Sequence, residues 1–268
     1  MLFIAITFIF WYHRINRLYY IILRYIMAWF FTEHNIKGDR HIITGEDAKH
    51  ISKVLRMSRG EELTIVTPDK TQCLCEVFSI NSDSVTVDVI SKKPCENEPD
   101  VFVTLYQALP KSDKMDFIVQ KCVELGVSRI VPMLSARCVS RPDAKSLAKK
   151  RERWQKIALQ AAMQSRRGII PEVCPCVSFQ NAAELTKENE QTIIFYEMGG
   201  APVREIIEKK PKTIGMFIGS EGGFEQSEVD LIAKSGGSAA TLGKRILRAE
   251  TAPLAALSVI MYQTGNFD

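Results

Sequence analysis

A glycine-rich segment, GSEGGF at residues 219–224, is the first candidate for a ligand-binding loop. It follows a predicted strand at 213–218 and precedes a predicted helix at 225–234, so its backbone N–H groups are available to a ligand. Three glycines permit positive φ angles and a close approach of the backbone. The segment matches neither GxGxxG nor GxxxxGK[ST], which disfavours a dinucleotide site or a triphosphate cradle. Taken alone, it fits a tight structural turn equally well.

A second segment, LGKRILRAETAP at residues 242–253, also leads from a predicted strand into a predicted helix. Thr251 stands at the N-cap position and Pro253 falls in the first turn, and both are typical of a helix start. Arg248 and Glu250 flank this start in otherwise apolar surroundings. They either pair with each other or offer a cation and a carboxylate beside a bound ligand.

The elements that carry both segments alternate between strand and helix from residue 101 onward. In the helix predicted at 114–125, apolar residues recur at i, i+3, i+4 and i+7, and Gly126 follows as a C-terminal cap. The other strands are predicted at 101–109, 130–134, 192–196, 213–218 and 239–242, and the other helices at 144–166, 203–208, 225–234 and from 252 to about 262. This alternation indicates a mainly parallel sheet covered on both faces. Such sheets bind ligands at the carboxyl ends of their strands.

The part of the chain before this alternation is rich in predicted β-strands. Strands at 63–66, 72–80 and 85–90 are separated by turn residues, and the last alternates valines with polar residues as half-buried antiparallel strands do. We expect a small barrel over 27–94, a short helix with one basic face at 50–56, and a linker at 95–99. The second domain then spans 100–268.

Length and composition indicate a folded protein of two domains. The chain has 268 residues, of which 46% are hydrophobic and 25% charged. Residues 1–26 stand apart: they are apolar, but HRINR interrupts them before they reach the ~20 residues of a membrane helix. We interpret them as an extension ahead of the true start at Met27. A membrane anchor is the alternative, so no membrane partner is expected unless this extension is genuine.

The charge distribution and the cysteine pattern limit the kinds of partner, metal site and cellular location that we expect. The net charge is only +4, but residues 141–167 hold nine basic residues against two acids, which suits a polyanionic partner or a solvated helix face. Seven cysteines and four histidines lack the spacing of a zinc site or a disulfide framework. We therefore expect reduced thiols, no metal and a cytoplasmic protein.

Four motifs in order resemble the RsmE-type RNA methyltransferases of the SPOUT class. GSEGGF with LGKRILRAETAP carries most of the likeness. KSDKMD running into QKCVELGV at 111–127, QSR with a later proline at 164–171, and HISKVLRM at 50–57 agree with it. The resemblance covers residues 27–268. Ser220 stands where the family commonly has proline, and Glu225 where it commonly has serine, which concerns loop geometry rather than reaction type.

The resemblance implies an α/β protein with an N-terminal PUA-like barrel and a C-terminal SPOUT domain that contains a trefoil knot and forms a homodimer. The implied cofactor is S-adenosylmethionine, and the implied reaction is methylation of N3 of uridine 1498 in 16S ribosomal RNA of the small ribosomal subunit. The implied cofactor-binding residues are Gly219, Ser220, Glu221, Gly222, Gly223, Leu242, Ile246, Leu247, Thr251 and Ala252.

Methylation at N3 requires loss of the imide proton, so a carboxylate and a cation are both useful. Our hypothesis is that Arg248 stabilises the uridine anion and that Glu250 or Glu221 is the base or orients it. The expected RNA contacts are His50, Lys53, Arg56, Lys149, Arg153 and Arg166. Two alternatives stay open: a SPOUT methyltransferase with another RNA target, and a non-catalytic RNA-binding assembly factor.

Overall fold

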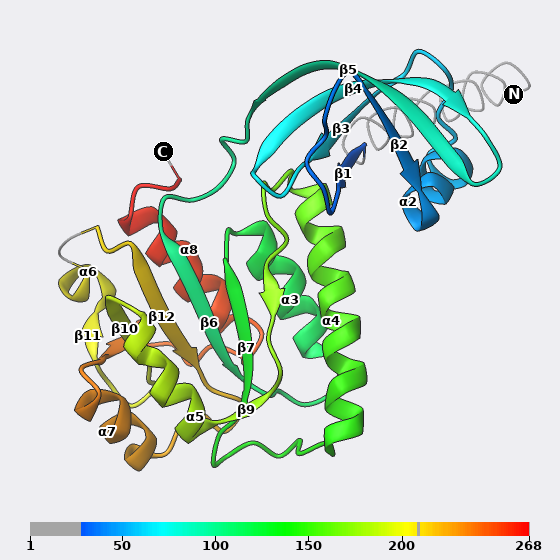
Figure 1. The fold of residues 1–268 in the computed structure, drawn as a ribbon. Helices are drawn as coiled ribbons and strands as arrows, with labels where there is room; N and C mark the ends of the chain where they lie inside the picture. Colours follow the sequence, from blue (N-terminus) through cyan, green and yellow to red (C-terminus); the bar gives the residue numbers. More distant parts are fainter. Residues whose placement is uncertain (1–27, 208–209, 268) are drawn as a thin grey trace, which may run out of the picture. The chain divides into compact units, whose positions relative to one another are not determined.

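The computed structural model describes residues 28–207 and 210–267 and divides the chain into two compact units (Figure 1). One holds the residues up to Asn97 together with Arg166–Ile169, and the other holds Glu98–Ser165 and the residues from Ile170 on. The predicted extension at 1–26 lies outside the described residues. Among those described, no helix is long and apolar enough to cross a membrane.

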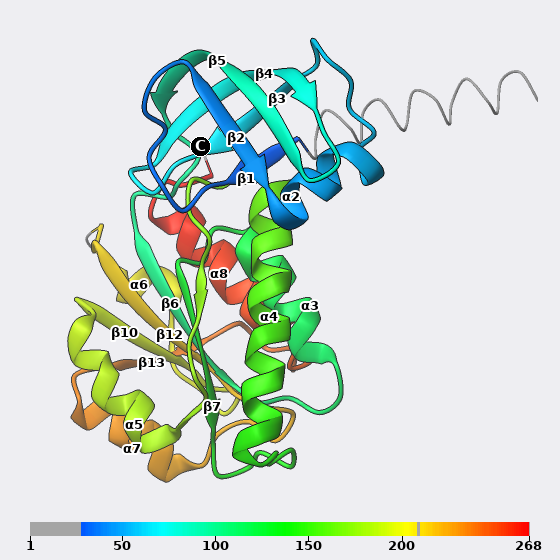
Figure 2. The same cartoon turned by 45° about the vertical axis from the view of Figure 1, so that its right-hand side comes forward.

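The first unit is built on a five-stranded sheet, in the order β1-β3-β4-β5-β2, that curls on itself (Figure 2). Its strands are β1 (Trp29–Phe31), β2 (Arg40–Thr44), β3 (Glu62–Val66), β4 (Thr71–Ile80) and β5 (Ser84–Pro94). Only the β1–β3 pair is parallel. Val85 and Val87 point into the core, as their alternation with polar residues predicted. The expected small barrel is therefore confirmed as a curled sheet, while β1 and β2 were not predicted.

The helix expected at 50–56 differs from its prediction. The chain forms a short α2 (Gly45–Lys49) that continues as a π-helical turn over His50–Val54. Arg56 already lies beyond it in a left-handed conformation, with φ of +50°. His50 turns its ring edge-on to buried Phe30, with the ring centroids 5.9 Å apart. The prediction of a helix with one basic face that extends to Arg56 is therefore wrong, because the helical segment ends before that residue.

The second unit contains an eight-stranded, wholly parallel sheet, which confirms the predicted α/β architecture. The order is β11-β13-β10-β12-β6-β7-β8, with β9 also paired to β7. The strands are β6 (Phe102–Ala108), β7 (Arg129–Leu134), β8 (Glu172–Val173), β9 (Val177–Ser178), β10 (Gln191–Phe195), β11 (Ala201–Pro202), β12 (Thr213–Ile218) and β13 (Ser238–Thr241). The two-residue strands β8, β9 and β11 were not predicted, because so short a run shows no periodicity.

Helices cover both faces of this sheet (Figures 1 and 2). On one face, α3 (Lys114–Glu124) packs against α4 (Ala144–Gln164) and α8 (Ala252–Gln263). On the other face lie α5 (Phe179–Glu184) and α7 (Gln226–Lys234). A short α6 (Val203–Ile206) contacts α8. The apolar residues predicted to line α3 are all buried, and Gly126 follows it with φ of +100°.

Candidate active site

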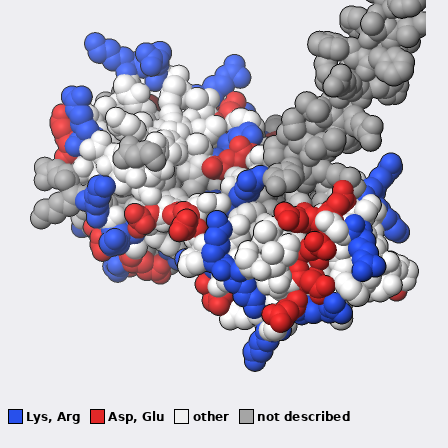
Figure 3. Space-filling view, turned by 90° about the horizontal axis from the view of Figure 1, so that it is seen from above, with Lys and Arg blue, Asp and Glu red and all other residues white. Residues whose placement is uncertain are grey.

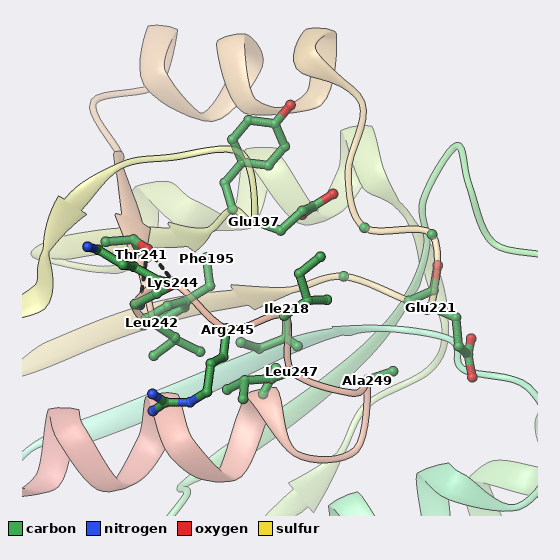
Figure 4. A pocket seen from close by; sticks show the side chains of 18 residues that line it. Phe195, Glu197, Ile218, Glu221, Thr241, Leu242, Lys244, Arg245, Leu247 and Ala249 are labelled. Carbon is green, nitrogen blue, oxygen red and sulfur yellow. Dashed lines mark hydrogen bonds between the residues drawn. The ribbon is translucent and has the colours of Figure 1, made fainter.

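A cavity of about 280 Å³ opens at the carboxyl ends of β10, β12 and β13 (Figure 4). It is lined by Phe195, Tyr196 and Glu197 after β10, by Ile218, Gly219, Ser220, Glu221, Gly222 and Gly223 after β12, and by Thr241, Leu242, Gly243, Lys244, Arg245, Ile246, Leu247, Ala249 and Ala252 after β13. Its size approaches the lower end of small-molecule sites, ~300–1,000 Å³. The strand ends therefore form one site, as expected for a parallel sheet.

The strand order explains why the cavity lies there. β12 and β13 follow each other along the chain as strands of the sheet, yet they lie on opposite sides of β10. The chain therefore passes over β10, and the loops after the three strands converge above its end. A crevice at such a change of direction is the usual ligand site of open α/β sheets.

The glycine-rich loop after β12 needs glycine for two different reasons. Gly223 has φ of +67°, and a Cβ placed there would lie 2.0 Å from the Oε1 atom of Glu197. A Cβ on Gly219 would lie 3.0 Å from the Cα atom of Gly223, because the loop folds back and the N–H of Gly223 donates to the carbonyl of Ser220. The loop is thus a tight turn and also a wall of the cavity.

The other wall is the segment after β13. Every residue predicted to contact the cofactor lines the cavity, with the exception of Thr251. Thr251 is exposed and stands at the N-cap position of α8, but its side chain makes no capping hydrogen bond. Its predicted position at the N-cap is therefore confirmed, without a side-chain hydrogen bond. Ile246 is 86% exposed, so one apolar side chain of this wall is largely uncovered.

Lys114 links the two predicted carboxylates. Its Nζ atom lies 3.0 Å from Glu221 Oε1 and 3.0 Å from Glu250 Oε2, so one cation at the start of α3 joins both loops. Glu221 also accepts from the backbone N–H of Lys111, at 3.2 Å. Glu250 thus pairs with Lys114, and the expected alternative of a pair between Arg248 and Glu250 is not what forms. Both carboxylates are held in place by the KSDKMD motif.

These contacts set the protonation of both acids. Burial acts to raise the pKa of Glu221, but hydrogen bonds from Lys114 and from the Lys111 N–H outweigh it and leave that pKa below its ordinary value. The ion pair with Lys114 lowers the pKa of Glu250, and the charge of Arg248 adds to this. The two carboxylates in turn raise the pKa of Lys114. All three groups are therefore charged at neutral pH.

Arg248 belongs to the segment after β13, between the lining residues Leu247 and Ala249, but it does not line the cavity itself. Its side chain is exposed, and within residues 28–207 and 210–267 it makes no ion pair or hydrogen bond. Its charge is therefore available to a ligand that arrives from solvent.

The predicted RNA-contacting residues fall into two groups, one in each unit. Lys149 is exposed on α4, whereas Arg153 on the same helix is bound by Asp116. Lys53 is exposed in the first unit, to which Arg166 also belongs. Figure 3 shows Lys and Arg interspersed with Asp and Glu over the face it draws, rather than one uniform basic surface.

Some features of the site carried no sequence signal of their own. Lys114 stands in the KSDKMD motif, but its pairing was not predicted, because its partners follow it by more than a hundred residues. Glu197 was not singled out, because it follows an ordinary strand. Arg137, after β7, donates from Nη1 to the carbonyl of Gly222, at 3.1 Å, and also had no signal. A search for charged residues just beyond each predicted strand would have found Glu197 and Arg137.

The comparisons with known proteins agree with this geometry. A family model described as an RNA methyltransferase domain matches residues 97–261, and one described as an RNA methyltransferase PUA domain matches residues 43–90. Ribosomal RNA small subunit methyltransferase E of Bacillus subtilis is 38% identical over 229 residues, which cover 83% of this chain and 90% of that protein. The chain belongs to the ribosomal RNA small subunit methyltransferase E family. The resemblance stated from its motifs is confirmed.

Two solved structures of similar proteins contain a cofactor. Ribosomal RNA small subunit methyltransferase E from Neisseria gonorrhoeae, bound to S-adenosyl methionine, is 30% identical with a TM-score of 0.80, and the match covers 88% of this chain and 97% of that one. A putative methyltransferase from Legionella pneumophila, also in complex with SAM, is 28% identical with the same TM-score and the same coverage. The methyltransferase fold predicted for the second unit is thus confirmed.

Proposed function

We propose that this protein uses S-adenosylmethionine to methylate N3 of uridine 1498 in 16S ribosomal RNA. The observation that carries the proposal is the cavity above β10, where the glycine-rich loop and the segment after β13 meet. Two relatives of the same fold were crystallised with this cofactor, which supports its assignment here. The N3 position and the nucleotide rest on the family resemblance.

The residues of the cavity fit such a cofactor. Phe195, Ile218 and Leu247 give apolar walls for an adenine ring, and the glycine-rich loop exposes backbone polar groups that can read its edge. When bound, the cofactor supplies an electrophilic methyl group on a sulfonium sulfur. The remaining chemistry, which is removal of a proton and placement of the base, belongs to the protein.

The uridine must leave its stack and lose its N3 proton, and unstacking costs roughly a few kcal/mol. Arg248, exposed near the cavity, would stabilise the oxygens of the uridine anion. Glu221 and Glu250 are poor acceptors for a proton whose pKa lies well above neutral, because Lys114 lowers the pKa of both. We therefore propose that both orient the reacting groups, and that one of them accepts the N3 proton as Arg248 stabilises the uridine anion that forms.

RNA binding would use the exposed basic side chains of both units. Lys149 on α4 and Lys53 in the first unit, both exposed, are the first candidates for phosphate contacts. Arg56, Arg153, Arg166 and the half-buried His50 complete the proposed set. Phosphate contacts release counterions, so binding would weaken steeply as salt is raised. Such contacts position the RNA and leave selection of the base to the active site.

A homodimer belongs to the same proposal. On α8, the outward-facing Val259 and Tyr262 are 40% and 69% exposed, although this helix is apolar on nearly every side. A helix that is apolar all round is normally covered, and a second copy would cover it. The trefoil knot is proposed on the resemblance alone, and the cytoplasmic location also on the cysteine pattern. Proteolytic mapping and cell fractionation would test them.

Mass spectrometry of 16S rRNA nucleosides from a deletion strain tests the function. We expect loss of N3-methyluridine, restored by the chain starting at Met27 and not by its Arg248→Ala variant. Loss of a different methylated nucleoside would show another RNA target. Unchanged nucleosides, with no S-adenosylmethionine binding in isothermal titration, would show a non-catalytic RNA-binding factor. Full restoration by Arg248→Ala would remove the role given to that arginine.

A further inference from the structure

Glu197 is a carboxylate in the cavity to which the reaction outlined above gives no task. It follows the end of β10 by two residues, and its side chain is 31% exposed. Figure 4 shows the side chain reaching across the cavity toward the glycine-rich loop. The 2.0 Å separation between Glu197 Oε1 and a Cβ built on Gly223 places the carboxylate directly against that loop.

The acceptor capacity of Glu197 is left largely unused by the protein. Its nearest charged neighbour is Arg137, whose Nη1 atom lies 4.0 Å from Oε1, beyond hydrogen-bond distance. Within the part of the chain that the structure describes, the carboxylate accepts no hydrogen bond. The other acid in the lining, Glu221, is already occupied by Lys114 and by the Lys111 N–H. Glu197 is thus the lining acid that can still accept hydrogen bonds from a ligand.

The surroundings favour a neutral donor over a cation. An ionised carboxylate accepts through two oxygens and donates nothing, so a pair of adjacent hydroxyl groups matches it. Arg137 already places a positive charge beside Glu197, which weakens the attraction of this carboxylate for a second cation. In nucleotide-binding folds, an acid near the end of a parallel strand binds ribose hydroxyls in the same way.

We propose that Glu197 binds the 2′ and 3′ hydroxyl groups of the cofactor's ribose. The inference rests on the proposed function, because it requires an adenosine-containing ligand in this cavity. It also gives a reason for glycine at position 223, since any side chain there would displace the carboxylate that holds the sugar. Glu197 would then be a binding residue that does not handle the transferred methyl group or the N3 proton.

Isothermal titration of the full chain tests this without measuring activity. The ligands are S-adenosylhomocysteine and its 2′,3′-dideoxy analogue, and the proteins are wild type, Glu197→Ala and Glu197→Gln. We expect wild type to prefer the diol at least tenfold, Glu197→Ala to bind both ligands alike, and Glu197→Gln to keep part of the preference. Glu205→Ala removes an exposed acid of α6 outside the cavity and should behave as wild type.

Other outcomes overturn the inference in distinguishable ways. A diol preference that persists in Glu197→Ala would show that other groups hold the ribose. If the variant instead fails to distinguish S-adenosylhomocysteine from its deaminated analogue while wild type does, Glu197 binds the ammonium group and the ribose assignment is wrong. A wild-type protein that binds neither S-adenosylmethionine nor S-adenosylhomocysteine would remove the proposed function itself. Thermal denaturation of each variant shows whether it is folded.

Discussion

Replacing Gly223 by alanine would produce two effects that a matched variant can separate. At Gly223, φ is +67° and the new Cβ would lie 2.0 Å from Glu197 Oε1. At Gly236, after α7 and outside the cavity lining, φ is +85° and nothing lies within 4 Å of a new Cβ. Gly236→Ala therefore carries the backbone strain alone. Gly223→Ala carries a similar strain and a collision with the carboxylate.

The expected magnitudes follow from these two environments. A left-handed conformation costs an alanine roughly 1–2 kcal/mol. At about 2–4 °C per kcal/mol for a chain of this size, both variants should lose about 2–8 °C in Tm. The colliding atom ends a flexible side chain, so Glu197 can rotate away at little further cost in stability. That rotation removes it from the ligand, and cofactor affinity in Gly223→Ala should fall at least about tenfold, or ~1.4 kcal/mol.

Thermal denaturation and titration with S-adenosylhomocysteine measure the two effects independently. Gly236→Ala should match Gly223→Ala in Tm and wild type in affinity. In a Glu197→Ala background, adding Gly223→Ala should cost little further affinity, because the group that it displaces is already gone. Wild-type affinity in Gly223→Ala, or an equal affinity loss in Gly236→Ala, would refute this account of the loop.

Three further predictions concern Lys114, the proposed RNA contacts and the proposed dimer. In Lys114→Met, the pKa values of Glu221 and Glu250 should return toward their ordinary 4.5. Both are lowered in the folded wild type, so they stabilise it above the unfolded-state pKa, and this contribution is lost as pH falls through the folded pKa. The free energy of unfolding, measured by urea denaturation, should therefore depend less on pH in the variant than in wild type below about pH 4.5. An equal pH dependence in both proteins would contradict the pairing of Lys114 with the two carboxylates. Lys149→Ala should lower the slope of log affinity for 16S rRNA against log salt by about 1, and a change in affinity with an unchanged slope would count against a phosphate contact. Tyr262→Asp should shift the protein to monomer in analytical ultracentrifugation, and an unchanged mass would exclude this face of α8 as the interface.

Periodicity alone predicted most of the second unit. Local rules of helix and strand formation account for the apolar spacing of α3, for the glycine after it, and for the run of apolar residues in β12. Glu225 shows that a helix-capping role can be filled by a different residue type. It stands where a serine is common, yet it still caps α7 through a reciprocal capping box with Glu228.

The pairing of distant groups could not be predicted in the same way. Whether Arg248 or Lys114 would pair with Glu250 depends on which strand ends become neighbours, and the sequence does not state the strand order. The same holds for Glu197, which becomes a cavity residue only because β12 and β13 lie on either side of β10. The helix at 50–56 was misplaced because its π-helical turn has no distinct sequence pattern.

The position of the cavity wall at 241–252 also has a consequence for synthesis of the chain. A ribosome must complete nearly the entire protein before this wall exists, although β6, β7, β10 and β12 are made long before it. A chain that terminates early could fold its curled sheet and retain much of its basic surface, yet it would have no closed site for the methyl donor. Under the proposed function, premature termination would thus yield a product that keeps most of the proposed RNA contacts and lacks the site for the methyl donor.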